Sequence, residues 1–192
     1  MKEIRYIGID LGTNYLATTY DGDNSKHYTT SILSARSKFK SSTSPSRRST
    51  FTNAIHTQIN LVVDDLCNRY QEDTFILEGM PEFHKEPSDF EKVRIEYHIL
   101  YKQLKERNAN LVLVDRTATS ITCPHCGFKD AKNRKPTYHI FSCLLCEFKE
   151  NDDVTAAMNI RLRGMEQIEK MKTSDLNINP NKEEILAVSK VS

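Results

Sequence analysis

The sequence predicts an α/β fold built on a mixed β-sheet, and three observations support this prediction. Short apolar segments typical of buried strands occur along the chain, tight turns join the first of them, and helical periodicity separates the later ones. Strands joined by tight turns run antiparallel, whereas strands joined through a helix run parallel. We therefore expect an antiparallel start followed by right-handed crossovers.

The first fifty residues are predicted to form three strands and a loop. Three segments carry the strand pattern, and an Asp-Gly-Asp-Asn turn at residues 21–24 separates the second from the third. Residues 34–50 are rich in Ser, Thr and basic residues and contain Pro45, which indicates a mobile loop or the irregular start of a helix. The three predicted strands are residues 5–10, 16–20 and 27–33.

Helices and strands alternate in the rest of the predicted domain. Apolar residues recur every three or four positions from 51 to 70, which indicates an amphipathic helix, and a buried strand follows at 74–78. A second helix is expected to begin near Pro87 and is followed by a strand at 110–115. After a cysteine-rich segment, residues 153–171 are predicted to form the last helix.

The composition is that of a globular protein with an uneven distribution of charge. The chain has 192 residues, 38% of them hydrophobic, which is enough for one domain and a small module. The formal net charge is only +1, yet residues 24–63 contain no Asp or Glu. The basic residues of that segment would attract a polyanion, and a solvated loop without a partner is the alternative.

Cysteine spacing and the absence of targeting signals indicate an intracellular protein. No segment approaches the roughly 20 apolar residues of a membrane-spanning helix, and the first residues lack the features of a secretory peptide. Four of the five cysteines form two C-x-x-C pairs, which in a reducing compartment indicate metal binding rather than disulfides. The fifth, Cys67, is expected to be buried. We expect a cytoplasmic protein without a membrane partner.

The two C-x-x-C pairs predict one structural zinc ion per chain. Four thiolates match the tetrahedral preference of Zn²⁺, and they leave no coordination position for a substrate. The ion should therefore fold a module that is too short to have a core of its own. The predicted ligands are Cys123, Cys126, Cys143 and Cys146. The loop between the pairs carries basic residues expected to contact nucleic acid, namely Lys129, Lys132, Arg134 and Lys135.

Acidic residues end two of the predicted strands and begin the last predicted helix. They are Asp10, Glu78, and either Asp152 or Asp153. In an open α/β sheet the chemistry gathers at the ends of the central strands, so these residues can meet there. Because three carboxylates repel one another, such a site indicates divalent cations, and two Mg²⁺ ions there would promote phosphodiester hydrolysis. Each acid alone is more often a surface charge or a helix cap.

Several motifs together resemble the C-terminal half of the transposon-encoded TnpB proteins and of their relatives, the compact type V CRISPR nucleases. The motifs are GIDLGTN, ILEG, TATSITCPHCG, the second C-x-x-C and DDVTAAMNI, and the resemblance extends from about Ile4 to Gly164. It implies a RuvC-type nuclease with an RNase H-like fold that a zinc ribbon interrupts before the last helix. It also implies that Asp10, Glu78 and Asp153 are the catalytic, magnesium-binding residues and that Asp152 is not. The host would be a prokaryote or a phage-infected cell.

The sequence differs from the family pattern at three places. A nucleic-acid-binding wedge and a helical recognition region usually precede the RuvC part, whereas the first predicted strand here begins close to Met1. We therefore expect a separate recognition protein or a second copy of the chain, with guide RNA as a candidate partner. Gly79 and Met80 follow Glu78 where Asp-Leu is common, and Glu147 follows the last cysteine where glycine is common.

Three other functions compete with this interpretation. GIDLGTN also resembles the first phosphate loop of actin-like and sugar-kinase-like ATPases, but the chain is too short for their two lobes, and none of its six glycines are adjacent. A non-cleaving nucleic-acid-binding zinc-ribbon protein is the second. A standalone endonuclease that cuts branched DNA, as a Holliday junction resolvase does, is the third.

The leading hypothesis is a Mg²⁺-dependent DNA endonuclease of the RuvC type, associated with a transposon or another mobile element. The phosphate backbone would be bound by the ribbon residues and by residues of the acid-free segment, which are Arg36, Lys38, Lys40, Arg47 and Arg48. The predicted organisation is a nuclease core at residues 1–116, a zinc ribbon at 117–150, the last core helix at 151–172 and a tail at 173–192.

Overall fold

The computed structural model describes residues 3–12, 15–29, 45–79, 90–107 and 109–178, and it contains a five-stranded mixed sheet. The strand order is β3-β2-β1-β4-β5. The first three strands pair antiparallel, whereas β4 lies parallel to β1 and β5 parallel to β4. The predicted fold class is confirmed. The strands are β1 (Tyr6–Asp10), β2 (Ala17–Tyr20), β3 (Ser25–Tyr28), β4 (Thr74–Glu78) and β5 (Asn110–Val114).

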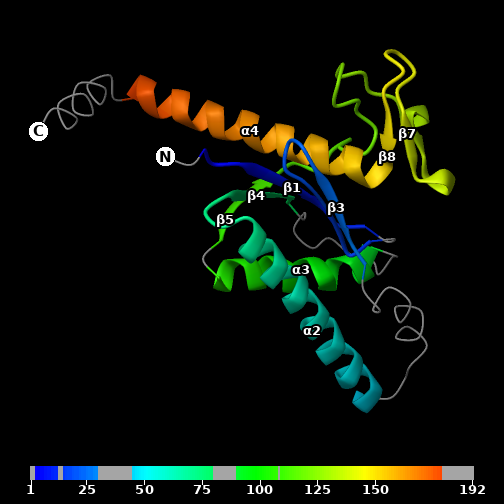
Figure 1. The fold of residues 1–192 in the computed structure, drawn as a ribbon, viewed down its shortest axis with the longest axis vertical. Helices are drawn as coiled ribbons and strands as arrows, with labels where there is room; N and C mark the ends of the chain where they lie inside the picture. Colours follow the sequence, from blue (N-terminus) through cyan, green and yellow to red (C-terminus); the bar gives the residue numbers. More distant parts are fainter. Residues whose placement is uncertain (1–2, 13–14, 30–44, 80–89, 108, 179–192) are drawn as a thin grey trace, which may run out of the picture.

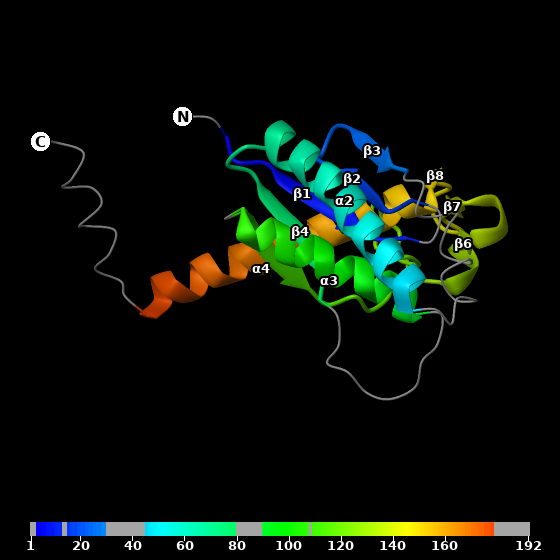
Figure 2. The same ribbon diagram turned by 90° about the horizontal axis from the view of Figure 1, so that it is seen from below.

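Helices cover both faces of this sheet. The helices α2 (Pro45–Arg69) and α3 (Phe90–Glu106) lie on one face, and the long helix α4 (Asp152–Ile178) crosses the other face (Figures 1 and 2). Among the described residues, no helix combines the length and the apolar composition that a membrane crossing requires.

Alternation along the central strands divides the core between the two faces. Ile7 and Ile9 of β1 belong to the large core under α2 and α3, as do Phe75 and Leu77 of β4. Ile76, between the last two, packs instead with residues of α4 and β5. Since the side-chain period of a strand is two, Asp10 and Glu78 belong to the same face as Ile76.

Two glycines allow α4 to approach the sheet closely. A Cβ atom at Gly8 of β1 would lie 2.0 Å from the carbonyl oxygen of Ala157 in α4. A Cβ atom at Gly164 of α4 would lie 2.2 Å from Cδ1 of Ile76 in β4. Both distances are far below van der Waals contact. A side chain at Gly8 would displace the backbone of the helix, and one at Gly164 would displace the Ile76 side chain or the helix. The start of α4 is thereby held against the centre of the sheet.

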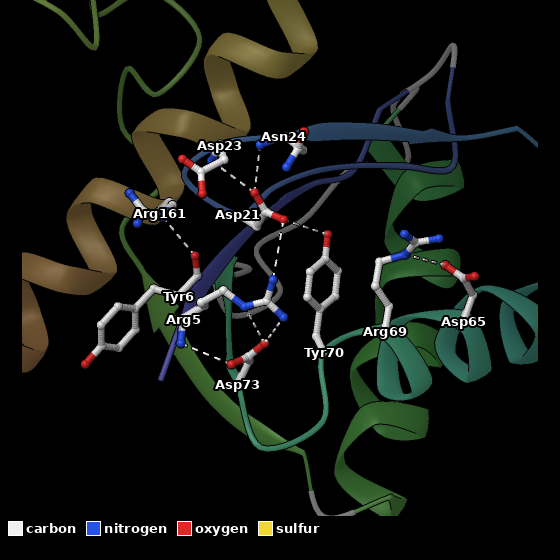
Figure 3. A network of polar contacts seen from close by, with 10 residues as sticks. All are labelled: Arg5, Tyr6, Asp21, Asp23, Asn24, Asp65, Arg69, Tyr70, Asp73 and Arg161. Carbon is white, nitrogen blue, oxygen red and sulfur yellow. Dashed lines mark hydrogen bonds and ion pairs between the residues drawn. The ribbon is translucent and has the colours of Figure 1, made fainter. Parts of the chain in front are cut away.

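A polar network fixes the end of the sheet at which β1 begins, opposite to the end that carries Asp10 (Figure 3). The backbone N–H of Arg5 and its guanidinium donate to the two carboxylate oxygens of buried Asp73, at 3.0 and 2.7 Å. The same guanidinium lies over the ring of Tyr70, 5.2 Å from its centroid. Arg161 of α4 donates to the carbonyl oxygen of Tyr6 at 2.8 Å. These contacts connect the start of β1 to β4 and to both helical layers.

Three predicted elements differ from the structure by more than one residue. The third strand is Ser25–Tyr28 rather than 27–33, and the end of the predicted segment lies outside the described residues. Helix α2 begins at Pro45 rather than at residue 51, so residues 45–50 form the helix start that was the alternative to a loop. Proline is well tolerated at a helix start because its missing N–H has no partner there. Helix α4 continues to Ile178, so the first residues of the expected tail are helical.

A small module lies between β5 and α4. Its three-stranded antiparallel sheet consists of β6 (Arg134–Lys135), β7 (Ile140–Ser142) and β8 (Lys149–Asn151), and two short 3₁₀ turns, Ala131–Asn133 and Pro136–Tyr138, flank β6. Its core is formed by cysteines and by aromatic rings, with Phe141 completely buried. The module lies beside the first turns of α4 (Figure 1).

Candidate functional site

Three acidic residues from separate elements converge where the parallel strands end. Ile9 pairs with Leu77, so the next residues, Asp10 and Glu78, end two neighbouring strands. Asp153 lies in the first turn of α4 and is buried. Its Oδ1 would be 3.6 Å from a Cβ atom at Gly12, in the turn after β1. The fold therefore brings the three predicted acids to one end of the sheet.

Burial and mutual repulsion make this end of the sheet unfavourable for negative charge. The pKa of Asp10 is raised well above its usual range, first by burial and then by the charges of Glu78 and Asp153. The pKa of Asp153 is also raised, by burial and by the neighbouring Asp152, although Arg134 opposes the shift. A cation at this point would relieve both effects.

The chemistry of the donor groups fits a hard divalent cation. Asp153 Oδ2 is buried and has no hydrogen-bond partner, and carboxylate oxygens are the ligands that Mg²⁺ prefers. The carboxylates do not gather as tightly as metal ligands do. Within the described part of the chain, the four cysteines are the one group of three or more His, Cys, Asp and Glu residues close enough to hold a metal ion.

Glu78 is held by a residue that the sequence did not single out. The hydroxyl of Thr119, which follows β5, donates a hydrogen bond to Glu78 Oε1. Burial raises the pKa of Glu78, whereas this hydrogen bond and the guanidinium groups of Arg116 and Arg163 lower it. The TATSITCPHCG motif contains Thr119, but nothing in its spacing pointed to Glu78.

The start of α4 is capped and lies in a polar junction with the small module. Asn151 Oδ1 accepts hydrogen bonds from the backbone N–H groups of Asp153 and Val154, at 2.9 and 3.2 Å. Asp152 is completely buried, and its Oδ2 accepts from Nε of Arg134 at 2.8 Å. Arg134, expected to contact nucleic acid, is thus bound to the residue beside Asp153.

The four cysteines form a compact group of sulfur ligands. All four Sγ atoms lie within 4.8 Å of one another, and the group can hold a metal ion. The two C-x-x-C turns have matching hydrogen bonds: the N–H of Cys123 donates to the Phe128 carbonyl at 2.9 Å, and that of Cys143 to the Phe148 carbonyl at 2.8 Å. Such repeated turns direct two sulfurs each towards one point.

Asn133 joins the two cysteine turns. It is completely buried, its Nδ2 donates to the carbonyl oxygens of Ile121 and Phe128, and its Oδ1 accepts from the N–H of Leu144 at 3.0 Å. Burial would raise the pKa of Cys143, but the backbone N–H groups of Cys146 and Leu145 lower it to about 7. These N–H groups favour the thiolate of Cys143, the form that binds metal.

The other predicted residues are distributed over three parts of the chain. Lys129, Lys132 and Lys135 are exposed on the small module. Arg47 and Arg48 belong to the first turn of α2. Cys67 is partly buried against the main core rather than fully buried. The remaining predicted residues, Arg36, Lys38 and Lys40, lie outside the described residues.

Comparisons with known proteins match both the fold and the module. Residues 96–160 match the family described as Cas12f1-like, TNB domain. A Cas12f1–sgRNA–target DNA complex superimposes with a TM-score of 0.60 at 18% identity, over 84% of this chain and 50% of that one. A CRISPR-Cas12f ternary complex superimposes with a TM-score of 0.58 at 18% identity, over 83% of this chain and 39% of that one. The mini-RNA-guided endonuclease CRISPR-Cas_phi3 superimposes with a TM-score of 0.50 at 19% identity, over 68% of this chain and 21% of that one.

The chain is similar in fold to the Cas12f and Cas_phi3 structures, and residues 96–160 are similar to the Cas12f1-like TNB domain. At these identities the superpositions establish the fold, and the family match adds the segment that contains the four cysteines. The chain spans half the length of the Cas12f1 structure and 39% of the second one. No curated protein sequence matches it.

Proposed function

We propose that this chain is the nuclease part of a Mg²⁺-dependent DNA endonuclease that hydrolyses phosphodiester bonds. One observation carries the proposal: Asp10, Glu78 and Asp153 come from three separate elements to the end of the central strands, where burial and repulsion favour a cation. The likeness in fold to the Cas12f1–sgRNA–target DNA complex and to the mini-RNA-guided endonuclease CRISPR-Cas_phi3 supports the same conclusion.

In this proposal the three acids hold the cations, and two bound Mg²⁺ ions would activate a water molecule and stabilise the leaving oxygen of the phosphodiester. The residues of the chain provide the arrangement. The ends of β1 and β4 carry Asp10 and Glu78. Asn151 caps the start of α4, and Gly8 lets this helix lie close to the sheet, so that Asp153 is directed towards the other two acids. Asp152, bound by Arg134, takes no part as a cation ligand.

The small module is proposed to be a structural zinc ribbon with one Zn²⁺ held by the four cysteines. Its exposed residues Lys129, Lys132 and Lys135 would bind the phosphate backbone without reading sequence. We propose the same phosphate-binding role for Arg36, Lys38, Lys40, Arg47 and Arg48. Nucleic acid partners are consistent with the Cas12f1 structure, whose name includes sgRNA and target DNA. A guide RNA, and a separate recognition protein or a second copy of the chain, belong to the same proposal.

The decisive experiment is cleavage by the purified chain, measured on single-stranded, duplex and four-way-junction DNA. Each substrate is incubated with Mg²⁺ and without it. Asp10→Ala should abolish cleavage, whereas Asp23→Ala, in an exposed turn, should not change it. Cleavage that persists in Asp10→Ala would contradict the mechanism. RNA that copurifies with the chain, sequenced from the same preparation, tests for a guide.

A non-cleaving nucleic-acid-binding protein is the second candidate. The observation that favours it is that, among the described residues, the carboxylates do not form a group close enough for a metal ion, whereas the cysteines do. Binding that weakens steeply with salt, without cleavage of any substrate, would support this function. Cleavage confined to the four-way junction would instead support a standalone, structure-selective endonuclease.

A further inference from the structure

A buried hydrogen-bond network connects the carboxylate site to the chain segment that leads into the small module. Its first member is Thr119, whose side chain is almost completely buried and whose hydroxyl donates to Glu78 Oε1. A hydroxyl has one proton to donate. The Arg116 carbonyl oxygen, at 3.2 Å, is a second acceptor for it, and an ionised carboxylate is the stronger acceptor of the two. The bond restricts the carboxylate of Glu78 at the end of β4.

The second member is Asn159, on the same helix as Asp153. Its side chain is also buried, and its Nδ2 donates to the carbonyl oxygens of Thr119 and Thr122, at 2.7 and 2.8 Å. Both side-chain protons are therefore used to hold the 119–122 segment against α4. The placement of Glu78 and the placement of Asp153 are linked through this one segment.

The backbone before Thr119 adopts an unfavourable conformation. Ala118 has a φ of 63°, in the left-handed region that disfavours a residue with a Cβ atom. The carbonyl oxygen of Ala118 accepts from both the N–H and the hydroxyl of Thr122, at 3.2 and 2.8 Å. The tight turn is thus maintained by several contacts, and its result is that the next side chain faces Glu78.

We propose that Thr119 and Asn159 are positioning residues that set the location of the Glu78 carboxylate relative to Asp153. This inference rests on the proposed function, because it assumes that these carboxylates bind divalent cations together. It assigns the segment before the first cysteine a role in the cation site in addition to its role as the connection to the module. Neighbours that orient a metal ligand commonly contribute 10- to 100-fold to affinity, as an order of magnitude.

The test measures Mn²⁺ binding to the full chain, by electron paramagnetic resonance of free Mn²⁺ or by calorimetry. Thr119→Val removes the hydroxyl but keeps the shape, and should weaken Mn²⁺ binding by about 10-fold or more. Thr119→Ser restores the donor and should stay within about threefold of the wild type. Thr117→Val, in the same loop but exposed, should bind Mn²⁺ as the wild type does. Zinc content and melting temperature check that each variant is folded.

A second variant and a separate control make the result decisive. Asn159→Ala leaves Thr119 in place but frees its segment, and should also weaken Mn²⁺ binding. Wild-type affinity in Thr119→Val, or in Asn159→Ala if the valine variant does not fold, would overturn the positioning role. Wild-type affinity in Glu78→Gln and in Asp10→Asn would instead overturn the proposed cation site. The two failures are therefore distinguishable without measuring cleavage.

Discussion

The cysteine group and the carboxylate group are two candidate metal sites of different construction. The four cysteines lie within 24 consecutive residues, at 123–146, and their sulfurs approach within 4.8 Å on two similar turns. The three acids come from positions 10, 78 and 153 and depend on two strands and a helix. Thiols can approach one another as neutral groups, whereas neighbouring carboxylates repel at neutral pH. The cysteine site, which local turns form, can therefore be compact without a bound ion. In the carboxylate site, which tertiary packing forms, the acidic groups stay further apart.

The largest expected effect is the loss of the module on removal of one sulfur ligand. Cys143→Ser should release zinc and unfold residues 123–151, since structural zinc contributes on the order of 10 kcal/mol to small modules. Hydrogen exchange should become fast there while β1 and β4 stay protected. A module that remains protected without zinc would mean that Phe141 and its neighbours suffice as a core.

A larger residue at the contact between α4 and the sheet should disturb the carboxylate site and leave the cysteine site unchanged. Gly8→Ala places a methyl group against the Ala157 carbonyl and should cost about 2–4 kcal/mol of unfolding free energy. It should also weaken Mn²⁺ binding without changing zinc content. Urea unfolding gives the first quantity. The matched control is Gly79→Ala, whose added Cβ would meet nothing nearer than 3.5 Å and should cost much less.

Removing one acid should stabilise the protein when divalent cations other than zinc are absent. The pKa of Asp10 is raised, so its contribution to stability is present below the ordinary Asp pKa and is lost as the pH rises through the raised value. At pH 7 in magnesium-free buffer, Asp10→Asn should therefore unfold at higher urea concentration, by at least about 1 kcal/mol.

The same measurement across pH checks the sign of this effect. The advantage of Asp10→Asn should shrink towards pH 3, where the wild-type carboxyl is protonated, and should shrink at pH 7 when Mg²⁺ is added. Asp23→Asn, which changes an exposed acid, should show neither trend. An advantage that is constant from pH 3 to pH 7 would indicate a cause other than charge.

The smallest expected effect compares the two cysteine turns with each other. Gly127 and Glu147 occupy equivalent positions and both adopt left-handed backbone, with φ of 76° and 62°. Glu147→Gly should therefore stabilise the zinc-bound module by about 0.5–1 kcal/mol, and Gly127→Ala, which meets no atom within 4 Å, should destabilise it by a similar amount. Zinc competition with a chromophoric chelator measures both. Equal affinities in all three proteins would show that this turn is not strained.

The structure at the second turn also explains a departure from the family pattern. Glu147 replaces a common glycine, yet its N–H still donates to the Cys143 carbonyl at 3.2 Å, as that of Gly127 does to Cys123 at 2.9 Å. The turn accepts the side chain because Glu147 is exposed. Only the backbone conformation carries a cost there.

Much of the fold could be predicted because its signals are local. Apolar alternation and helical periodicity identified all five strands of the main sheet and the three α-helices among the described residues, and turn chemistry indicated the antiparallel start. Boundaries were less predictable. Pro45 was compatible with a loop or with a helix start, and it begins α2; the local sequence did not separate the two, because proline is common in both places.

The sequence by itself determined the cysteine spacing, the three acids at element ends and the order of strands and helices. Only the tertiary structure decided that Gly8 and Gly164 let α4 lie directly on the sheet, that Arg134 binds Asp152, and that Thr119 and Asn159 reach Glu78 and the 119–122 segment. The physical reason is the range of each interaction. Periodicity and ligand spacing act within a few turns of chain, whereas these close backbone contacts and buried hydrogen bonds join residues 18 or more positions apart.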